Sequence, residues 1–125
     1  MEGPILSSVK ELLGISYEDE SFDFEILMHI NATLTILFQM GVDEAGDTPV
    51  IDITTTWREL FGDRTDLEMV KTYIYFKVKS MFDPPTNSAG LESLNRIMKE
   101  FEWRINNLET INHTSKEVIK DERRT

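Results

Sequence analysis

The chain has 125 residues, a formal net charge of −10, two histidines and no cysteine. This length supports one hydrophobic core and not two, and the absence of thiols excludes disulfides and thiolate metal sites. The acidity argues against binding nucleic acid by phosphate neutralisation. No secretion signal and no membrane-spanning run is evident, so we expect an intracellular product without a membrane partner.

The N-terminal third predicts two helices separated by an acidic loop. The first covers residues 4–13, with Pro4 at the first helical position and Gly14 just past the end, where these residue types are favoured. The second runs from residue 21 or 22 to residue 40, because apolar residues recur at helical spacing. The acidic residues between and at the start of the helices suit a solvated loop and a helix N-terminus.

The middle of the chain predicts loops around one short helix. Residues 42–49 have loop composition, and the acidic residues within them lack EF-hand spacing, so we expect no metal there. Residues 50–53 suit a short extended segment packed along the helices. Thr56 can cap a helix over residues 57–61, because Glu59 follows it at the capping-box spacing.

The C-terminal half predicts a helical hairpin around which the chain is organised. Its first arm covers residues 66–82, with Thr65 as N-cap, and is apolar over most of its circumference. The sequence Phe82-Asp83-Pro84-Pro85 then forces a rigid corner, because proline disfavours helix at the preceding residue. The second arm, capped by residue 87 or 88, carries an apolar seam that ends at residue 108.

These elements predict an all-α fold, a small bundle of four to five helices built on the central hairpin. Residues 1–108 would form the helical domain. Residues 109–125 would be a charged C-terminal extension, frayed or disordered, because the apolar seam fades there.

Catalytic chemistry has little to build on in this sequence. No nucleophile elbow, phosphate-binding loop, zinc-protease motif or dinucleotide fingerprint is present. The carboxylates fall mainly in loops and lack a partner of defined spacing. We therefore predict no enzymatic activity, no catalytic residues, no cofactor and no metal.

Several stretches of the chain together resemble a known family. They are VKTYIYFKVK at residues 70–79, FDPP at 82–85 and EFEWRI at 100–105, with ILMHIN at 26–31 and Thr56-Trp57 upstream. In this combination the chain resembles the head–tail connector (adaptor) proteins of tailed bacteriophages and prophages of Gram-positive bacteria. The resemblance covers residues 20–108.

The resemblance implies a structural subunit of the virion, at the head–tail interface, that is assembled in the bacterial host cytoplasm. Such subunits form a homo-oligomeric ring, usually of twelve copies, under the portal protein. The ring bridges the portal to a stopper or tail-completion protein and leaves a channel through which DNA passes without specific binding. The family has no catalytic residues. Its C-terminal arm often docks on the portal, which by position alone points to Lys116, Val118, Ile119, Lys120, Arg123 and Arg124.

Two further sets of residues are candidates for a ring. A closing interface needs exposed aromatic or apolar groups, and the candidates are Tyr75, Arg96, Trp103 and Asn107. Carboxylates facing a channel would repel DNA, and the candidates are Glu18, Asp19, Glu20, Asp43, Glu44 and Asp47. Equally, Trp103 can simply lie along charged side chains at the surface, and the acidity can simply keep a free subunit soluble.

Two other functions remain open from the sequence. An acidic binding protein could mimic DNA and block a host nucleic-acid enzyme, with its carboxylates along one face. The chain could also be a small helical regulatory binding protein with no role in a phage.

Overall fold

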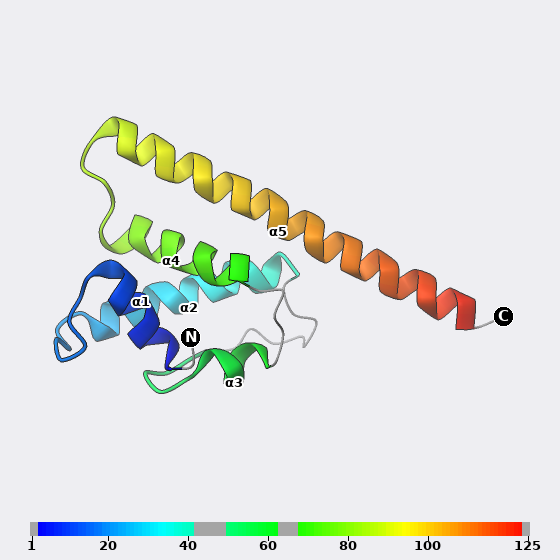
Figure 1. Cartoon of the computed structure of the whole chain (residues 1–125), viewed down its shortest axis with the longest axis horizontal. Helices are drawn as coiled ribbons and strands as arrows, with labels where there is room; N and C mark the ends of the chain where they lie inside the picture. Colours follow the sequence, from blue (N-terminus) through cyan, green and yellow to red (C-terminus); the bar gives the residue numbers. More distant parts are fainter. Residues whose placement is uncertain (1–2, 42–49, 63–67, 124–125) are drawn as a thin grey trace.

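The computed structural model describes residues 3–41, 50–62 and 68–123, with side chains as far as residue 107. Within these ranges the chain forms helices and no strand (Figure 1). The helices are α1 (Ile5–Leu13), α2 (Asp23–Gln39), α3 (Trp57–Phe61), α4 (Glu68–Phe82) and α5 (Ser88–Arg123). The prediction of a small all-α bundle built on a central hairpin is confirmed.

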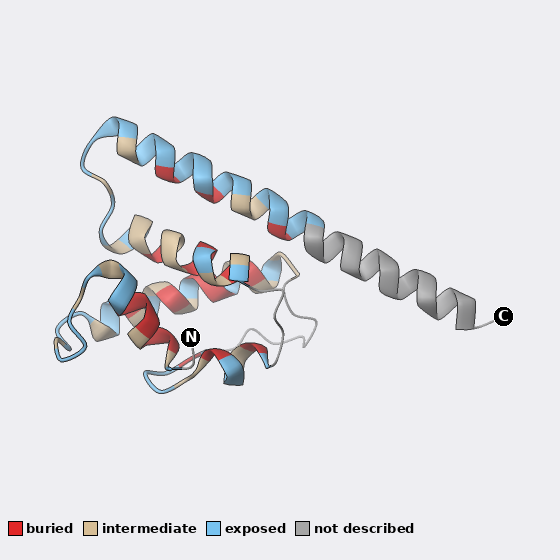
Figure 2. Cartoon of the chain, in the orientation of Figure 1, coloured by how far each residue is buried: buried red, intermediate tan, exposed pale blue. Residues whose placement is uncertain are grey.

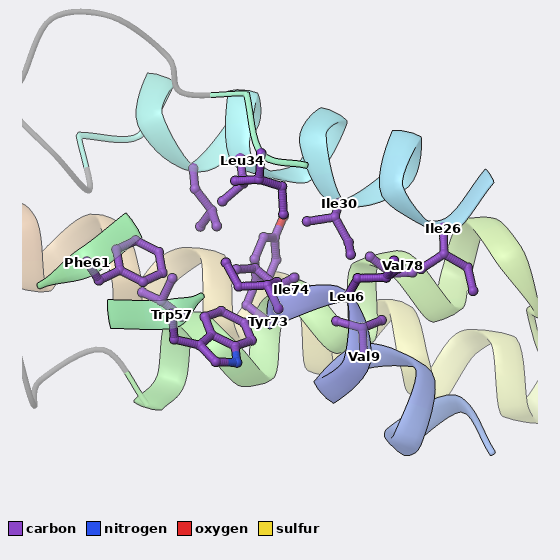
Figure 3. Close-up of a cluster of buried hydrophobic side chains, with 14 of the residues drawn as sticks. Leu6, Val9, Ile26, Ile30, Leu34, Trp57, Phe61, Tyr73, Ile74 and Val78 are labelled. Atoms are coloured by element: carbon purple, nitrogen blue, oxygen red, sulfur yellow. The ribbon is translucent and has the colours of Figure 1, made fainter. Parts of the chain in front are cut away.

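Helix α4 is the centre of the bundle. It packs against α1 and α2 on one side and against α5 on the other. Its side chains Val70, Tyr73, Ile74 and Val78 are all buried, and they meet apolar residues of α1, α2 and α3 in one core (Figure 3). Each such side chain contributes about 1.5–3 kcal/mol through burial. The apolar circumference of this helix therefore predicted its central position.

Helix α5 is longer than the sequence pattern indicated. It continues past residue 108, where the predicted second arm ended, to Arg123. Residues 109–123 of the extension expected to be frayed or disordered are thus helical. The physical reason is that no glycine or proline follows Gly90, so nothing in the chain ends the helix.

Three helix ends show the predicted capping chemistry, whereas Pro4 precedes α1, whose first residue is Ile5, instead of occupying the first helical position. Gly14 closes α1 with a positive φ of 78°, a conformation that costs glycine little. At α3, the backbone N–H of Glu59 donates to Thr56 Oγ1 at 3.1 Å. At α5, the N–H of Gly90 donates to Asn87 Oδ1 at 2.6 Å. The predicted cap at Thr65 lies outside the described residues.

The proline corner turns the chain between α4 and α5, and side chains then hold the two arms together. The phenol of Tyr73 donates to Glu102 Oε1 at 2.9 Å, and the rings of Phe76 and Phe101 lie 5.9 Å apart. At the corner itself, the Phe82 ring meets the edge of Phe22 from the start of α2 at 5.4 Å. Side-chain contacts therefore join α4 to α5 within the hairpin, and a ring contact joins the corner to the start of α2.

The segment before α3 is held on α2 by the side-chain amide of Asn31, which hydrogen-bonds to the backbone of Ile51. Asn31 Oδ1 accepts from the N–H of Ile51 at 2.9 Å, and Asn31 Nδ2 donates to the Ile51 carbonyl at 3.2 Å. The N–H of Ile5 donates to the Thr55 carbonyl at 2.9 Å. Of the segment predicted to pack along the helices, Ile51 is buried against the bundle, whereas Val50 and Ile53 are exposed, and the segment forms no strand.

Candidate functional site

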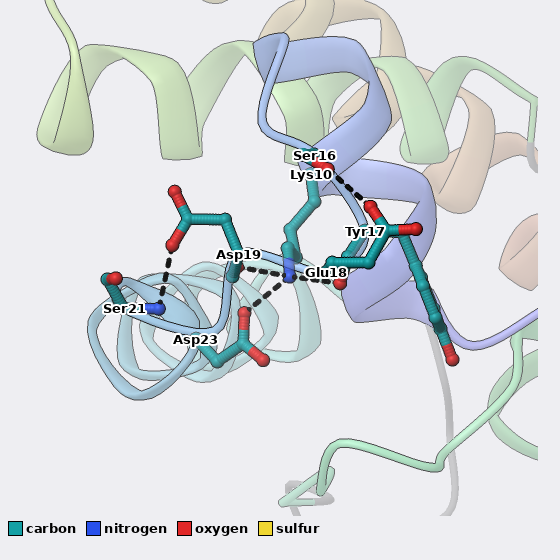
Figure 4. A network of polar contacts seen from close by, with 7 residues as sticks. All are labelled: Lys10, Ser16, Tyr17, Glu18, Asp19, Ser21 and Asp23. Carbon is teal, nitrogen blue, oxygen red and sulfur yellow. Dashed lines mark hydrogen bonds and ion pairs between the residues drawn. The ribbon is translucent and has the colours of Figure 1, made fainter.

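A buried lysine organises the acidic loop between α1 and α2. Lys10 is only 3% exposed. Its Nζ donates to the carbonyls of Tyr17 at 3.2 Å and Asp19 at 2.7 Å, and pairs with Asp23 Oδ1 at 2.8 Å (Figure 4). A buried ammonium group is tolerated only when it is paired and hydrogen-bonded, as it is here. The loop is therefore shaped around one cation.

The carboxylates of this loop are fixed by hydrogen bonds at the surface. Glu18 accepts from the Ser16 hydroxyl at 2.6 Å, and this bond lowers the Glu18 pKa below its usual value. Asp19 accepts from the N–H of Ser21 at 3.0 Å, and the Ser21 hydrogen bonds lower the Asp19 pKa in the same way. Both groups stay ionised at neutral pH. The loop thus presents fixed negative charge.

The acidic residues proposed from the sequence as a channel lining fall into two groups. Glu18 and Glu20 are exposed and Asp19 is partly buried, all in this one loop. Asp43, Glu44 and Asp47 lie outside the described residues. Sequence reasoning missed the role of Lys10, although a lysine among the apolar residues of α1, followed by an acidic loop, was a signal for it.

An open groove of about 420 Å³ runs beside α1 between the acidic loop and the segment before α3. Two side chains on its rim are conspicuously exposed for their type, Tyr17 at 76% and Ile53 at 57%. The groove is lined by Pro4, Leu6, Ser7, Lys10, Tyr17, Glu18, Glu20, Asp23, Ile53 and Thr54. An apolar rim beside carboxylates suits a partner that is both apolar and basic.

The outer face of α5 carries most of the candidate interface residues. Arg96, Trp103 and Asn107 are exposed, and their helical spacing puts them opposite the buried seam of Leu94 and Ile105. Figure 2 shows the buried positions of α5 on the side facing α4 and exposed positions on the outer side. Trp103 is 69% exposed, so the indole covers little of its own helix.

The remaining interface candidate lies elsewhere. Tyr75 belongs to α4, is partly buried, and has its ring 5.3 Å from that of Phe76. The structure thus gathers three of the four candidates on one helix face and leaves Tyr75 on another helix. The proposed docking residues Lys116 to Arg123 lie in the C-terminal part of α5, where the structure describes the helix but not the side chains. Arg124 lies outside the described residues.

The described part of the chain offers two surfaces suited to contact with a partner, the groove and the outer face of α5. Within it, no three histidine, aspartate or glutamate side chains come close enough together to hold a metal ion. Among the same residues, no helix combines the length and apolar character needed to cross a membrane. The features that stand out are the groove and the outer face of α5.

The chain also matches one family of known proteins. The family model described as phage connector protein matches residues 5–111. This range begins at the first residue of α1 and includes every later residue whose side chain the structure describes. No curated protein and no solved structure matches the chain.

Proposed function

As this chain belongs to the phage connector protein family, we propose that its copies form a ring under the portal, joining the DNA-filled head to the tail. Membership itself makes the chain a structural connector of the virion, which acts with other head and tail proteins in assembly. The ring, its twelve copies, the central channel and a Gram-positive host belong to the proposal. So do the portal above, a stopper or tail-completion protein below, and assembly in the host cytoplasm.

The observation that carries this proposal is the family match over residues 5–111, from α1 into α5. The shape of the subunit supports it. A ring needs a head-to-tail interface made of two different patches on each copy. The outer face of α5, with Trp103, and the groove beside α1 are two such patches, and they belong to different sides of the bundle.

The negative charge of the subunit supports the proposal of a channel through which DNA passes. Glu18 and Glu20 are exposed on a loop that Lys10 holds in place. Carboxylates of this kind facing the lumen would keep the DNA hydrated and free to slide, whereas lysine or arginine would retain phosphates. We assign the same role to Asp43, Glu44 and Asp47.

The test is assembly with the purified portal of the same phage. Native mass spectrometry should show several copies of the chain bound to one portal ring. A variant ending at residue 115 should fold but lose portal binding, since the proposed docking residues are then missing. A full-length, folded chain that never joins the portal would contradict the proposal.

A second candidate function, mimicry of DNA, is favoured by one observation. Residues 3–41 and 50–62 carry eight acidic residues and two basic ones, so the negative charge is concentrated and not spread evenly. A DNA mimic should inhibit a host nuclease or polymerase at low salt and lose that inhibition at high salt. Replacing Glu18 and Glu20 with glutamine should then weaken inhibition, whereas no inhibition at any salt concentration would remove this candidate.

A further inference from the structure

The described bundle is divided by charge. Its α1–α3 part, residues 3–41 and 50–62, has eight acidic and two basic residues. The hairpin part, residues 68–107, has five acidic and six basic residues. The two parts lie on opposite sides of the contact between α4 and the pair α1 and α2 (Figure 1). One subunit therefore offers surfaces of unlike charge in unlike directions.

The acidic part contains a concave surface with apolar groups on it. The groove beside α1 places Tyr17 and Ile53 next to Glu18 and Glu20. Lys10, which also lines the groove, is already paired with Asp23 and two carbonyls. The charge left for a partner is thus negative.

The hairpin part carries exposed cations beside an exposed indole on the outer face of α5. Arg96, Lys99 and Trp103 lie at positions i, i+3 and i+7 of α5, so they share one stripe of the helix, on which the exposed Glu92 lies one turn before Arg96. All three are exposed, and within residues 3–41, 50–62 and 68–107 no ion pair involves Arg96 or Lys99. The stripe joins two available cations to a protruding indole.

We propose that the outer face of α5 in one copy docks in the α1 groove of the next copy, an inference that rests on the proposed ring. Trp103 contacts Tyr17 and Ile53, and Arg96 and Lys99 face Glu18 and Glu20. These two carboxylates then lie at the contact between copies and not in the lumen, so the proposed channel lining is left to Asp19, Asp43, Glu44 and Asp47. Tryptophan and arginine are the residue types that dominate interface energetics, and complementary charge fixes the register of docking. The two patches differ and lie on different sides, so the contact repeats head to tail and can close a ring.

A charge-exchange experiment tests the pairing. The first variant carries Glu18→Lys and Glu20→Lys, and the second carries Arg96→Glu and Lys99→Glu. Each alone opposes like charges at every contact, so the concentration for half-assembly should rise by roughly tenfold or more. An equimolar mixture should recover assembly, because the reversed groove of one variant receives the reversed helix of the other in alternation. The control, Glu11→Lys with Glu25→Lys, makes the same charge change outside the groove and should assemble like the unaltered chain.

Cysteine cross-linking gives a second, independent readout, since the chain has no cysteine of its own. The double variant Ile53→Cys and Trp103→Cys should form a ladder of disulfide-linked multimers on portal rings. Each single variant should give no ladder beyond a dimer. Circular dichroism verifies that every variant is folded.

The outcomes separate this inference from the proposed function. Multimers on the portal that show no ladder and no response to charge exchange would overturn the pairing and leave the ring standing. Charge variants that both fail, without recovery on mixing, would also overturn it and assign the two surfaces to other partners, such as a basic segment of the portal. A chain that never multimerises, alone or on the portal, would remove both proposals.

Discussion

Lys10 shows how one side chain can determine the shape of a surface that lies outside its own helix. Its ammonium group satisfies two loop carbonyls and the carboxylate at the start of α2. The acidic loop thereby becomes a fixed feature, and the groove beside α1 acquires a wall. A lysine in this position is structural, a role that was not predicted from the sequence.

Replacing Lys10 with methionine should destabilise the protein by about 3 kcal/mol, because Asp23 and two carbonyls lose their shared partner. Urea unfolding measures this. The exposed Lys99→Met serves as control and should change stability by no more than about 0.5 kcal/mol. A Lys10→Met variant as stable as the control would show that the loop does not depend on this cation.

Tyr73 joins the two arms of the hairpin from a fully buried position. Burial, together with the bond to Glu102, raises the pKa of Tyr73 above its ordinary value of 10.0. The folded chain therefore keeps the phenolic proton at pH values where the unfolded chain loses it. The stability that this group contributes is fully present below pH 10 and falls as the pH rises beyond it.

Tyr73→Phe should cost about 1 kcal/mol at pH 7, through the lost hydrogen bond. Above pH 10, the free energy of unfolding should fall with pH more steeply for the unaltered chain than for the variant, by up to about 1.4 kcal/mol per pH unit. Denaturant unfolding from pH 7 to 11 measures the difference. Tyr17→Phe, at an exposed phenol, should follow the unaltered chain, and parallel curves for all three proteins would refute this account.

At the scale of elements, the segment before α3 depends on one residue of α2. Asn31 makes two hydrogen bonds to the backbone of Ile51, and Ile51 is buried. Asn31→Ala should lower stability by about 2 kcal/mol, since each bond contributes about 1 kcal/mol. It should also speed hydrogen exchange at the Ile51 amide.

The matched control for Asn31 is Thr35→Ala, one turn further along the exposed face of α2. The Thr35 hydroxyl donates only within its own helix, to the Asn31 carbonyl at 3.1 Å. This variant should leave both stability and exchange at Ile51 nearly unchanged. Rapid exchange at Ile51 in both variants would mean that the segment is not held by the asparagine.

The proline corner sets the geometry of the hairpin. Changing Pro84 and Pro85 together to alanine should cost about 1–2 kcal/mol, because proline limits the unfolded chain. It should loosen the angle between α4 and α5 and impair assembly on the portal more than it lowers helix content. Circular dichroism beside portal binding decides this, with Thr86→Ala as control. Normal assembly of the double variant would contradict the assigned role of the corner.

On the scale of the whole molecule, the net charge of −10 governs behaviour toward DNA. The protein should not bind duplex DNA even at low ionic strength, because its excess of negative charge repels the phosphates. Fluorescence anisotropy of a labelled duplex measures this. Binding that weakens with added salt would place a basic surface in the channel and overturn the assignment of the acidic loop.

The sequence by itself determined where the helices lie, the caps at Gly14 and Thr56, the corner and the all-α class, but not where α5 ends. These depend on local spacing, on glycine and proline, and on apolar residues repeating every three to four positions, which a linear sequence displays directly. It also determined that Trp103 faces away from the seam, since a helix fixes which positions are opposite.

Only the tertiary structure decided which surfaces exist. The groove, the partners of Lys10, the Asn31 contact with Ile51 and the separation of Tyr75 from Trp103 each join segments that are distant along the chain or on different helices. Helical periodicity carries no information about such distances, because it describes each helix alone. The acidic part and the hairpin part lie on opposite sides of the molecule only because α4 packs against α1 and α2, and this packing cannot be read from the sequence.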